Sequence, residues 1–459
     1  MADAPDDPRV LSAVPPPEQT AVPATVLDEP TPEGVAIRSL TGARLCVAQF
    51  LHLFALGSWI VTLGSYVEAN TGASGSGIFA AGFIGTIYGA GPLGGMVAPF
   101  LTGLLADHFF ATEKLMALLH LLGAAALGGA IAAESQSAFY VAALCYFLTF
   151  IPNSALLSSM TFHHLARPDR DYPIARACST GGWMASGLFV GWLWPTVTGM
   201  DSVEATNIPL KIAMTAELVM AAFCLTLPHT PPANKRQAGG PRRFSLAHTT
   251  SLLSDPRFMM LMALAVLAHV PSQFYYAYLN AYLNDWVQWD HAAAKMTLGQ
   301  MVEIGVMLIL PAVLLRVSIK TSMLIGLAFW VLRFWLISLS PSLAPTSRDA
   351  ALYVAIGLHG VAFTLLTISL QMDVDRCAGR GRRATAQGLL AVAMSGIGCF
   401  IGSELAGVFG TRLLPEDLAA ASVQGWRQFW LIPAGIAAGV WLLTAVFLPR
   451  DRALRARSD

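Results

Sequence analysis

Charged residues are scarce in this sequence. Only 12% of its 459 residues are Asp, Glu, Lys or Arg, whereas a soluble domain carries roughly 25%. This scarcity excludes an ordinary soluble globular domain. The 28 basic and 28 acidic residues balance to a formal net charge of zero, which gives no general attraction to a polyanion. We therefore expect no nucleic-acid partner.

Cysteine is rare as well, and its placement excludes a disulfide framework. Most of the six cysteines lie in or beside apolar stretches, where a thiol behaves as a small hydrophobic group. No Cys-x-x-Cys pair is present, and the adjacent His163 and His164 do not share a helix face. The sequence also lacks a Ser/His/Asp arrangement with a familiar context and a phosphate-binding loop. We expect no metal, no cofactor, no catalytic residue and no enzymatic activity.

The N-terminus shows no cleavable signal peptide. Residues 1–42 are rich in acid and proline and contain no apolar run. Such a segment cannot bury enough apolar surface to fold, so it is predicted to be a disordered cytoplasmic tail. The tail is also shorter than a typical domain of at least about 50 residues, which argues against a sensor with a signalling domain.

Apolar residues are abundant instead, at 55% of the chain. Apolar stretches of about 20 residues recur, and each is long enough to cross a hydrocarbon core roughly 30 Å thick. We predict an all-α polytopic membrane protein with twelve transmembrane helices. Their expected limits are 43–67, 79–106, 114–133, 138–165, 176–198, 208–228, 257–284, 296–316, 320–340, 350–373, 384–411 and 427–448.

The longest hydrophilic connector, 229–256, is basic and divides the chain into two predicted six-helix bundles, 43–228 and 257–449. A basic cytoplasmic tail, 450–459, follows. Lysine and arginine gather in the connectors of one side, which places both termini in the cytoplasm by the positive-inside rule. Two six-helix halves joined by a cytoplasmic linker form the layout of the major facilitator superfamily. In that fold the halves move around a site near the membrane midplane.

A loop between the second and third spans supports this layout. The segment "GLLADHFF" (103–110) resembles the superfamily's cytoplasmic loop motif, in which a glycine is followed four residues later by an aspartate. Gly103 would let two helices approach closely. Asp107 would form a hydrogen bond or ion pair with a helix terminus or a basic side chain at the cytoplasmic gate of a transporter of this superfamily. The match is partial, because His108 stands where a basic residue is usual.

Polar residues inside the apolar spans are few, and charged ones usually face the protein interior. Their spacing of three, four or seven residues places several on shared helix faces. The predicted faces are Arg176, Thr180 and Trp183; Gln273, Tyr276 and Asn280; Gln300 and Glu303; and His359 and Phe363. A guanidinium, a carboxylate, carboxamides and aromatic rings would together suit a polar, uncharged solute that carries a ring.

Other polar residues have competing interpretations. Arg176 and Glu303 could form a structural ion pair between the halves or a gate. Arg333 lies nearer the outer end of its span, where we expect a structural role with its head group reaching the interface. Glu217 and Glu404 could bind protons or join helices. His52 and His269 are expected to be packing residues.

Several segments resemble one family closely. They are "GSWIVTLGSY" (57–66), "GLLADHFFATEK" (103–114), "LTLPHTP" (225–231), "WVLRF" (330–334) and "RATAQG" (383–388). On these motifs the chain resembles the nucleoside:proton symporters of the major facilitator superfamily, of the bacterial nucleoside permease type, over about 43–448. The resemblance implies a solute site at positions that match the family's pocket, namely Arg176, Thr180, Gln273, Gln300, Glu303 and Phe363.

The chain departs from the family at other site positions. Trp183 stands for a phenylalanine, Tyr276 for an asparagine and His359 for a tyrosine. Thr364 stands where the family has an aspartate beside Phe363, so a group that could take up a proton is lost. Glu303 is then the best candidate for proton coupling, with His359, Glu217 and Glu404 in reserve.

From this resemblance we expect a monomeric multi-pass protein of the bacterial inner membrane, surrounded by lipid. It would import nucleosides by alternating access, with proton coupling. The alternative is a facilitator or symporter of a sugar or nucleoside-like metabolite that is not coupled through the usual aspartate. The predicted solute site also includes Trp183, Tyr276, His359 and Thr364.

Overall fold

The computed structural model describes residues 34–72, 75–108, 111–231, 246–378 and 382–448. Helices account for nearly all of this part of the chain, as predicted. The N-terminal half is built from these elements: α1 (Leu40–Ile60), α2 (Leu63–Ala69), α3 (Phe83–His108), α4 (Thr112–Ile131), α5 (Gln136–His164), α6 (Pro168–Leu188), the π-helical η2 (Phe189–Leu193), α7 (Trp194–Thr198) and α8 (Ile208–Cys224).

The C-terminal half repeats this layout after a short helix. Its elements are α10 (Leu246–Leu253), α11 (Pro256–Ala281), the π-helical η3 (Tyr282–Trp286), α12 (Ala292–Met296), α13 (Leu298–Leu314), α14 (Ile319–Leu339), η4 (Ser340–Ser342), α15 (Pro345–Ala378), α16 (Arg383–Ala391), the π-helical η5 (Val392–Gly398), α17 (Cys399–Leu413), η6 (Leu418–Ala420) and α18 (Val423–Phe447). The predicted linker 229–256 therefore contains a helix, α10.

Several helices begin at a residue whose side chain caps the first turn. Such a side chain accepts a hydrogen bond from a backbone N–H that has no partner inside the helix. Ser39, Ser135, Ser318 and Ser422 do this for α1, α5, α14 and α18. Asp255 accepts from the N–H groups of Arg257 and Phe258 at the start of α11. These N-capping serine and aspartate residues thus determine where the apolar helices start.

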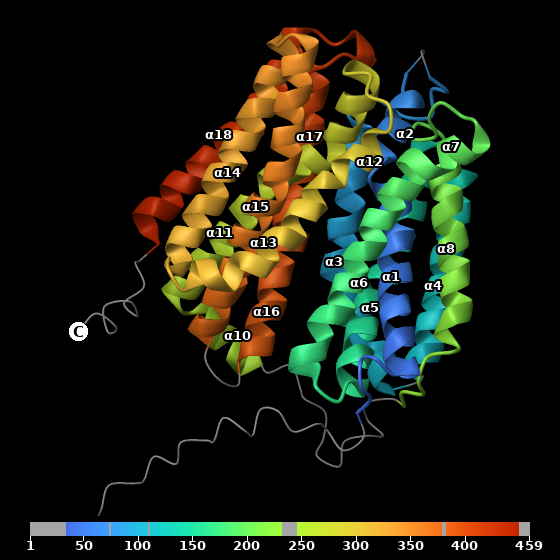
Figure 1. The fold of residues 1–459 in the computed structure, drawn as a ribbon, viewed down its shortest axis with the longest axis vertical. Helices are drawn as coiled ribbons and strands as arrows, with labels where there is room; N and C mark the ends of the chain where they lie inside the picture. The colour runs from blue at the N-terminus through green and yellow to red at the C-terminus, as the bar shows by residue number, and fades with distance from the viewer. Residues whose placement is uncertain (1–33, 73–74, 109–110, 232–245, 379–381, 449–459) are drawn as a thin grey trace, which may run out of the picture.

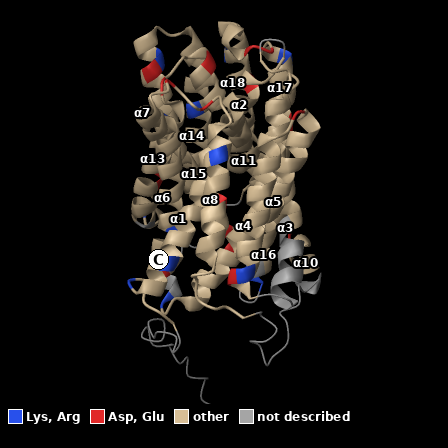
Figure 2. Cartoon of the chain, turned by 90° about the vertical axis from the view of Figure 1, so that its right-hand side faces the viewer, with Lys and Arg blue, Asp and Glu red and all other residues tan. Residues whose placement is uncertain are grey.

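Charged residues gather at the two ends of the molecule, and the zone between them is nearly free of charge (Figure 2). Within the described residues, nine helical segments are long and apolar enough to cross a membrane. Each of the twelve predicted spans coincides with a helix or with consecutive helices. The helix α8 has only 17 residues. The helix α6 begins at Pro168, before the predicted start of its span at 176, because its first turns are polar and do not add to an apolar stretch. Twelve crossings therefore stay a prediction.

The start of α1, the short helix α10 and the end of α18 lie at the same end of the molecule (Figure 1). We call the opposite end the outer end, following the predicted orientation. The helices α1–α8 form one group and α11–α18 the other, side by side (Figure 1). Near the outer end the two groups touch closely, since a Cβ at Gly64 would lie 2.5 Å from the carbonyl oxygen of Ala277.

Candidate functional site

The helix α6 carries the predicted residues of the N-terminal half. Arg176, Thr180 and Trp183 lie at intervals of about one turn on this helix. Arg176 is exposed, whereas Thr180 and Trp183 are partly buried. The backbone of α6 is held against α1, because a Cβ at Gly182 would overlap the backbone carbonyl of Phe50. This close packing fixes the face that the three side chains share.

The helix α11 carries Gln273 and Tyr276 on one face. Gln273 is 6% exposed, and its amide nitrogen donates a long bond of 3.4 Å to the Ser272 hydroxyl. A Cβ at Gly402 would lie 3.0 Å from the Gln273 side chain, so α17 packs tightly behind it. The carboxamide is therefore held in place while retaining capacity for further hydrogen bonds.

Two glycines bring α13 and α15 together beside Glu303. A Cβ at Gly360 would lie 2.6 Å from the Gly299 carbonyl oxygen and 2.7 Å from the Val302 carbonyl carbon, and it would overlap the backbone nitrogen of Glu303. Only glycine permits this approach. The contact sets the depth and rotation of Glu303, which is partly buried like Gln300 on the same helix.

His359 of α15 lies at the centre of an aromatic cluster. Its ring stacks on Tyr275 at a centroid distance of 5.2 Å and on Phe363 at 5.7 Å, and it meets Trp330 edge-on at 6.0 Å. Its Nε2 lies 3.5 Å from the Tyr276 hydroxyl. The predicted residues Tyr276, His359 and Phe363 are therefore brought together.

Arg333 does not reach the membrane interface, although its place in the span would allow this, and it is buried among other helices. Arg333 is 0% exposed, its guanidinium lies 3.9 Å from the Tyr275 ring centroid, and its Nη1 donates to Nδ1 of His359 at 2.6 Å. It lies on α14, which packs along α15. Aromatic faces and an imidazole lone pair stabilise the cation here without a carboxylate.

This arrangement determines which nitrogen of His359 carries a proton. Arginine can only donate, so Nδ1 of His359 must accept and cannot hold a hydrogen. The neutral ring then has its hydrogen on Nε2, directed at the Tyr276 oxygen. Tyr276 is left with its own hydroxyl hydrogen for another acceptor. A second proton on His359 would oppose the adjacent guanidinium, so His359 is a poor proton carrier.

Thr364 does not share the accessible surface of its neighbours. It is 0% exposed, and its hydroxyl is among the described buried atoms without a hydrogen-bond partner. Its place in the predicted site therefore stays a prediction.

Arg176 and Glu303 come from different halves and act on one another through space. The positive charge of Arg176 interacts electrostatically with the Glu303 carboxylate. Glu303 interacts in the same way with the Tyr276 hydroxyl. Across the described side chains, no ion pair within 4 Å joins Arg176 to Glu303. The two groups thus face a shared region without closing it.

Asn280 does not belong to this site, although it lies on the predicted face with Gln273 and Tyr276. It is 0% exposed near the outer end, where its amide nitrogen donates to Glu204 at 2.8 Å and its oxygen accepts from Ser65 at 2.8 Å. Asn284 also donates to Glu204, at 2.9 Å, and the backbone N–H of Ala293 does so at 3.0 Å. Glu204 and Ser65 come from the N-terminal half, so this network holds the outer ends of the two halves together.

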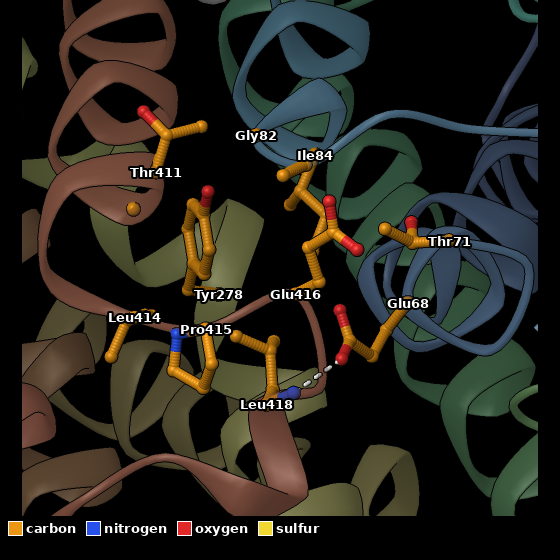
Figure 3. Close-up of a pocket in the computed structure, with 12 residues that line it drawn as sticks. Glu68, Thr71, Gly82, Ile84, Tyr278, Thr411, Leu414, Pro415, Glu416 and Leu418 are labelled. Atoms are coloured by element: carbon orange, nitrogen blue, oxygen red, sulfur yellow. Dashed lines mark hydrogen bonds between the residues drawn. The ribbon is translucent and has the colours of Figure 1, made fainter. Parts of the chain in front are cut away.

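A pocket at the same end extends this contact between the halves (Figure 3). The Leu418 backbone N–H donates to Glu68 at 2.6 Å across the junction. The pocket is lined by Glu68, Thr71, Ala81, Gly82, Ile84, Tyr278, Gly410, Thr411, Leu414, Pro415, Glu416 and Leu418. None of the predicted site residues is among them, so the pocket belongs to the outer closure.

The predicted gating-loop residues lie at the end of α3. Gly103 and Asp107 fall in the last turns of α3, and their side chains lie outside the described part of the chain. The sequence analysis missed Tyr275, Glu204 and Ser65. Tyr275 had a signal in its neighbour Tyr276, whereas Glu204 lies in a connector between helices, where helical spacing gives no signal.

Comparisons with known proteins show the family of the chain. A family model described as "Nucleoside H+ symporter" matches residues 40–452. The YegT protein of Escherichia coli (strain K12), a candidate nucleoside transporter, is 31% identical, covering 89% of this chain and 93% of the relative. The xanthosine permease of the same organism is 28% identical, covering 86% and 92%. The nucleoside permease NupG, also from that organism, is 26% identical, covering 85% and 92%.

Solved structures show the same fold. The crystal structure of the nucleoside transporter NupG matches with a TM-score of 0.76 and 24% identity, covering 89% of this chain and 98% of that one. A peptide transporter in complex with sulfate matches with a TM-score of 0.65 and 15% identity, covering 92% and 97%. The predicted major facilitator fold is thereby confirmed.

Proposed function

The chain belongs to the nucleoside H+ symporter family, and on this premise we propose that it imports nucleosides together with protons by alternating access. It is a multi-pass protein of the inner membrane, as the family and the nine apolar helical segments among the described residues indicate. We propose that it acts as a monomer within the lipid bilayer. The alternative of an uncoupled sugar facilitator is not favoured by the family.

One observation carries the assignment of the site. Arg176 of one half and Glu303 of the other act on each other without pairing directly, and Tyr276 and His359 lie on the same side as Glu303. A solute between the halves would satisfy groups of both halves at once. Such differential contact is what a transporter needs if the solute is to shift the balance between its states.

The chemistry of these groups suits a nucleoside. The guanidinium of Arg176 and the hydroxyl of Thr180 can bond a ribose, and the Glu303 carboxylate can accept from two adjacent hydroxyls. The carboxamides of Gln273 and Gln300 can match the donor and acceptor edge of a base. The rings of Trp183 and Phe363 offer faces on which the base can stack.

Glu303 is the residue that we propose to respond to protons within the solute site. His359 is a poor candidate because Arg333 occupies its Nδ1, and Thr364 does not titrate. Protonation of Glu303 would remove its attraction to Arg176 and change the contacts between the halves. The carboxylate would therefore serve both solute binding and the conformational change.

Calorimetric binding to the purified protein tests the proposal. We expect uridine and adenosine to bind, and glucose not to bind. Glu303→Gln should weaken nucleoside binding by roughly 10- to 100-fold, because a hydrogen bond to a charged group contributes about 1.5–3 kcal/mol. Glu134→Gln, which removes an exposed carboxylate in the connector between α4 and α5, is the matched control and should bind normally. Binding of glucose in place of nucleosides would contradict the proposal.

A further inference from the structure

A second group of titratable side chains lies inside the N-terminal half. Glu217 of α8 and His120 of α4 are 2% and 0% exposed, and His52 of α1 is 2% exposed. Tyr146 of α5 is also fully buried. Ionisable groups at such depth in a membrane are costly and are usually functional. None of these four residues belongs to the proposed solute site.

The hydrogen bonds define where a proton can be added. The Tyr146 hydroxyl donates to Oε1 of Glu217 at 2.9 Å, and Nδ1 of His120 lies 2.5 Å from Oε2. One proton therefore lies between His120 and Glu217. The remaining nitrogen of the ring, Nε2, has no partner in the described structure. Without a proton on Nε2 the pair carries one negative charge, and with one it is neutral.

The surroundings of the pair are apolar, and His52 is its nearest described polar neighbour on α1. A single net charge in an apolar interior is unfavourable. The ring of His52 meets that of His120 edge-on at 5.6 Å, and its own Nδ1 also lacks a partner. His52 Nε2 contacts the Ser154 hydroxyl at 2.6 Å. Arg176 of α6 interacts electrostatically with His52. Glu217 interacts in the same way with the thiol of Cys224 on α8.

We propose that the His120–Glu217 pair is a proton-binding site of the transport cycle, loaded at Nε2 of His120. The inference rests on the proposed function. It supplies, in the N-terminal half, a titrating group that position 364 lacks. The proton passes between the solute site and the pair by way of His52, whose ring meets that of His120 edge-on at 5.6 Å.

Loading of this site changes the electrostatic balance on Arg176. The unloaded pair is negative and attracts Arg176 toward its own half. The loaded pair is neutral, so Arg176 is released to interact with Glu303 and the solute. A proton bound at His120 therefore strengthens solute binding, and by reciprocity the solute strengthens proton binding. This is the coupling that symport requires.

Proteoliposomes containing the full-length protein separate the two claims. Counterflow exchange of labelled uridine at equal pH reports the transport function alone, and accumulation driven by an inward proton gradient reports the coupling. We expect Glu217→Gln and His120→Asn to retain exchange and to lose accumulation, so that internal uridine only reaches the external level. Glu134→Gln, which removes an exposed carboxylate between α4 and α5, is the matched control, and it should retain both activities.

Each result decides between the claims. Wild-type protein that exchanges no nucleoside would overturn the proposed function and, with it, the proton site. Exchange combined with accumulation by Glu217→Gln at the wild-type level would overturn the proton site alone, as would loss of accumulation in Glu134→Gln or wild-type exchange without any accumulation. If Glu217→Gln does not give folded protein by size-exclusion chromatography, His120→Asn is judged by the same criteria. If neither variant folds, Tyr146→Phe, which keeps both charged partners, should shift the pH dependence of accumulation, and an unchanged profile would overturn the site.

Discussion

Single residues in this protein act through the partners that bury them. Arg333 would be an isolated cation at membrane depth if it were read from its own helix. In the structure it contacts the faces of Tyr275 and Trp330 and donates to His359. Its effect on the site is therefore indirect, because it orients His359 and leaves the Tyr276 hydroxyl hydrogen free for another acceptor.

Replacement of Arg333 tests this indirect role. We expect Arg333→Gln to weaken uridine binding by roughly tenfold, since a lost charge-assisted hydrogen bond costs at least about 1.5 kcal/mol. Arg333→Lys keeps a donor for Nδ1 and should restore part of the affinity. Calorimetry on both variants makes the comparison, and equal affinity in all three proteins would show that His359 needs no orienting partner.

At the scale of helices, glycines determine how closely the site-bearing elements pack. Gly360 allows α15 to lie directly against the backbone of α13 next to Glu303. Gly305 lies on α13 too, but a Cβ there would meet nothing within 4 Å. The two positions separate the effect of close packing from the general effect of a glycine in a helix.

We therefore expect different results from alanine at these two positions. Gly360→Ala forces α13 and α15 apart, and overpacking of this kind costs about 1–3 kcal/mol. It should lower the melting temperature and weaken uridine binding, because Glu303 moves. Gly305→Ala should be neutral or slightly stabilising, because alanine favours helices over glycine by roughly 1 kcal/mol. Thermal unfolding measures both, and equal melting temperatures would contradict this account of the packing.

At the scale of the whole molecule, the outer ends of the two halves are joined by the Glu204 network. Glu204 is 1% exposed and accepts from Asn280, Asn284 and Ala293. Opening of the outer end requires these bonds to break. The balance between states thus depends on a loop carboxylate far from the proposed solute site.

Loss of Glu204 should favour opening of the outer end. In Glu204→Ala the buried amide of Asn280 and the buried N–H of Ala293 lose this acceptor, at a cost of about 1–3 kcal/mol each when left unpaired. Spin labels at positions 202 and 290, which lie in exposed outer segments of the two halves, should report a longer distance. Asp201→Ala removes an exposed acid of the same loop and should leave the distance unchanged. An unaltered distance in Glu204→Ala would mean that other contacts keep the end closed.

The Glu204 carboxylate should also make closure of the outer end depend on pH. Burial raises the pKa of Glu204 above its usual value, although the N–H donors of Asn284, Asn280 and Ala293 and the charge of His291 oppose this. Asp285 also lies in its field. The closed end therefore holds a proton more tightly than an opened, hydrated one, so acid favours closure and alkali favours opening. The spin-label distance should lengthen as the pH rises, and Glu204→Gln should reduce that change to the part contributed by Glu68 and Asp285, whose pKa values burial raises to about 8 and about 7.

Features that lie within one helix could be predicted from the sequence, whereas contacts between helices could not. The apolar spans could be predicted because hydrocarbon imposes a length and a composition on every crossing. The faces bearing Arg176 and Glu303 could be predicted from helical spacing. The contact between Arg333 and His359 could not, since it joins different helices. The role of Asn280 could not be predicted from spacing, because α11 is long enough for one face to serve both the site and the outer closure.

Uridine accumulation in proteoliposomes tests the central claim most directly. With an inward proton gradient, the account predicts that internal uridine rises above the external level, that a protonophore abolishes the rise, and that Glu303→Gln prevents it. Glucose should not accumulate under the same conditions. No uptake of any nucleoside, with or without the gradient, would contradict the assignment of this chain as a proton-coupled nucleoside importer.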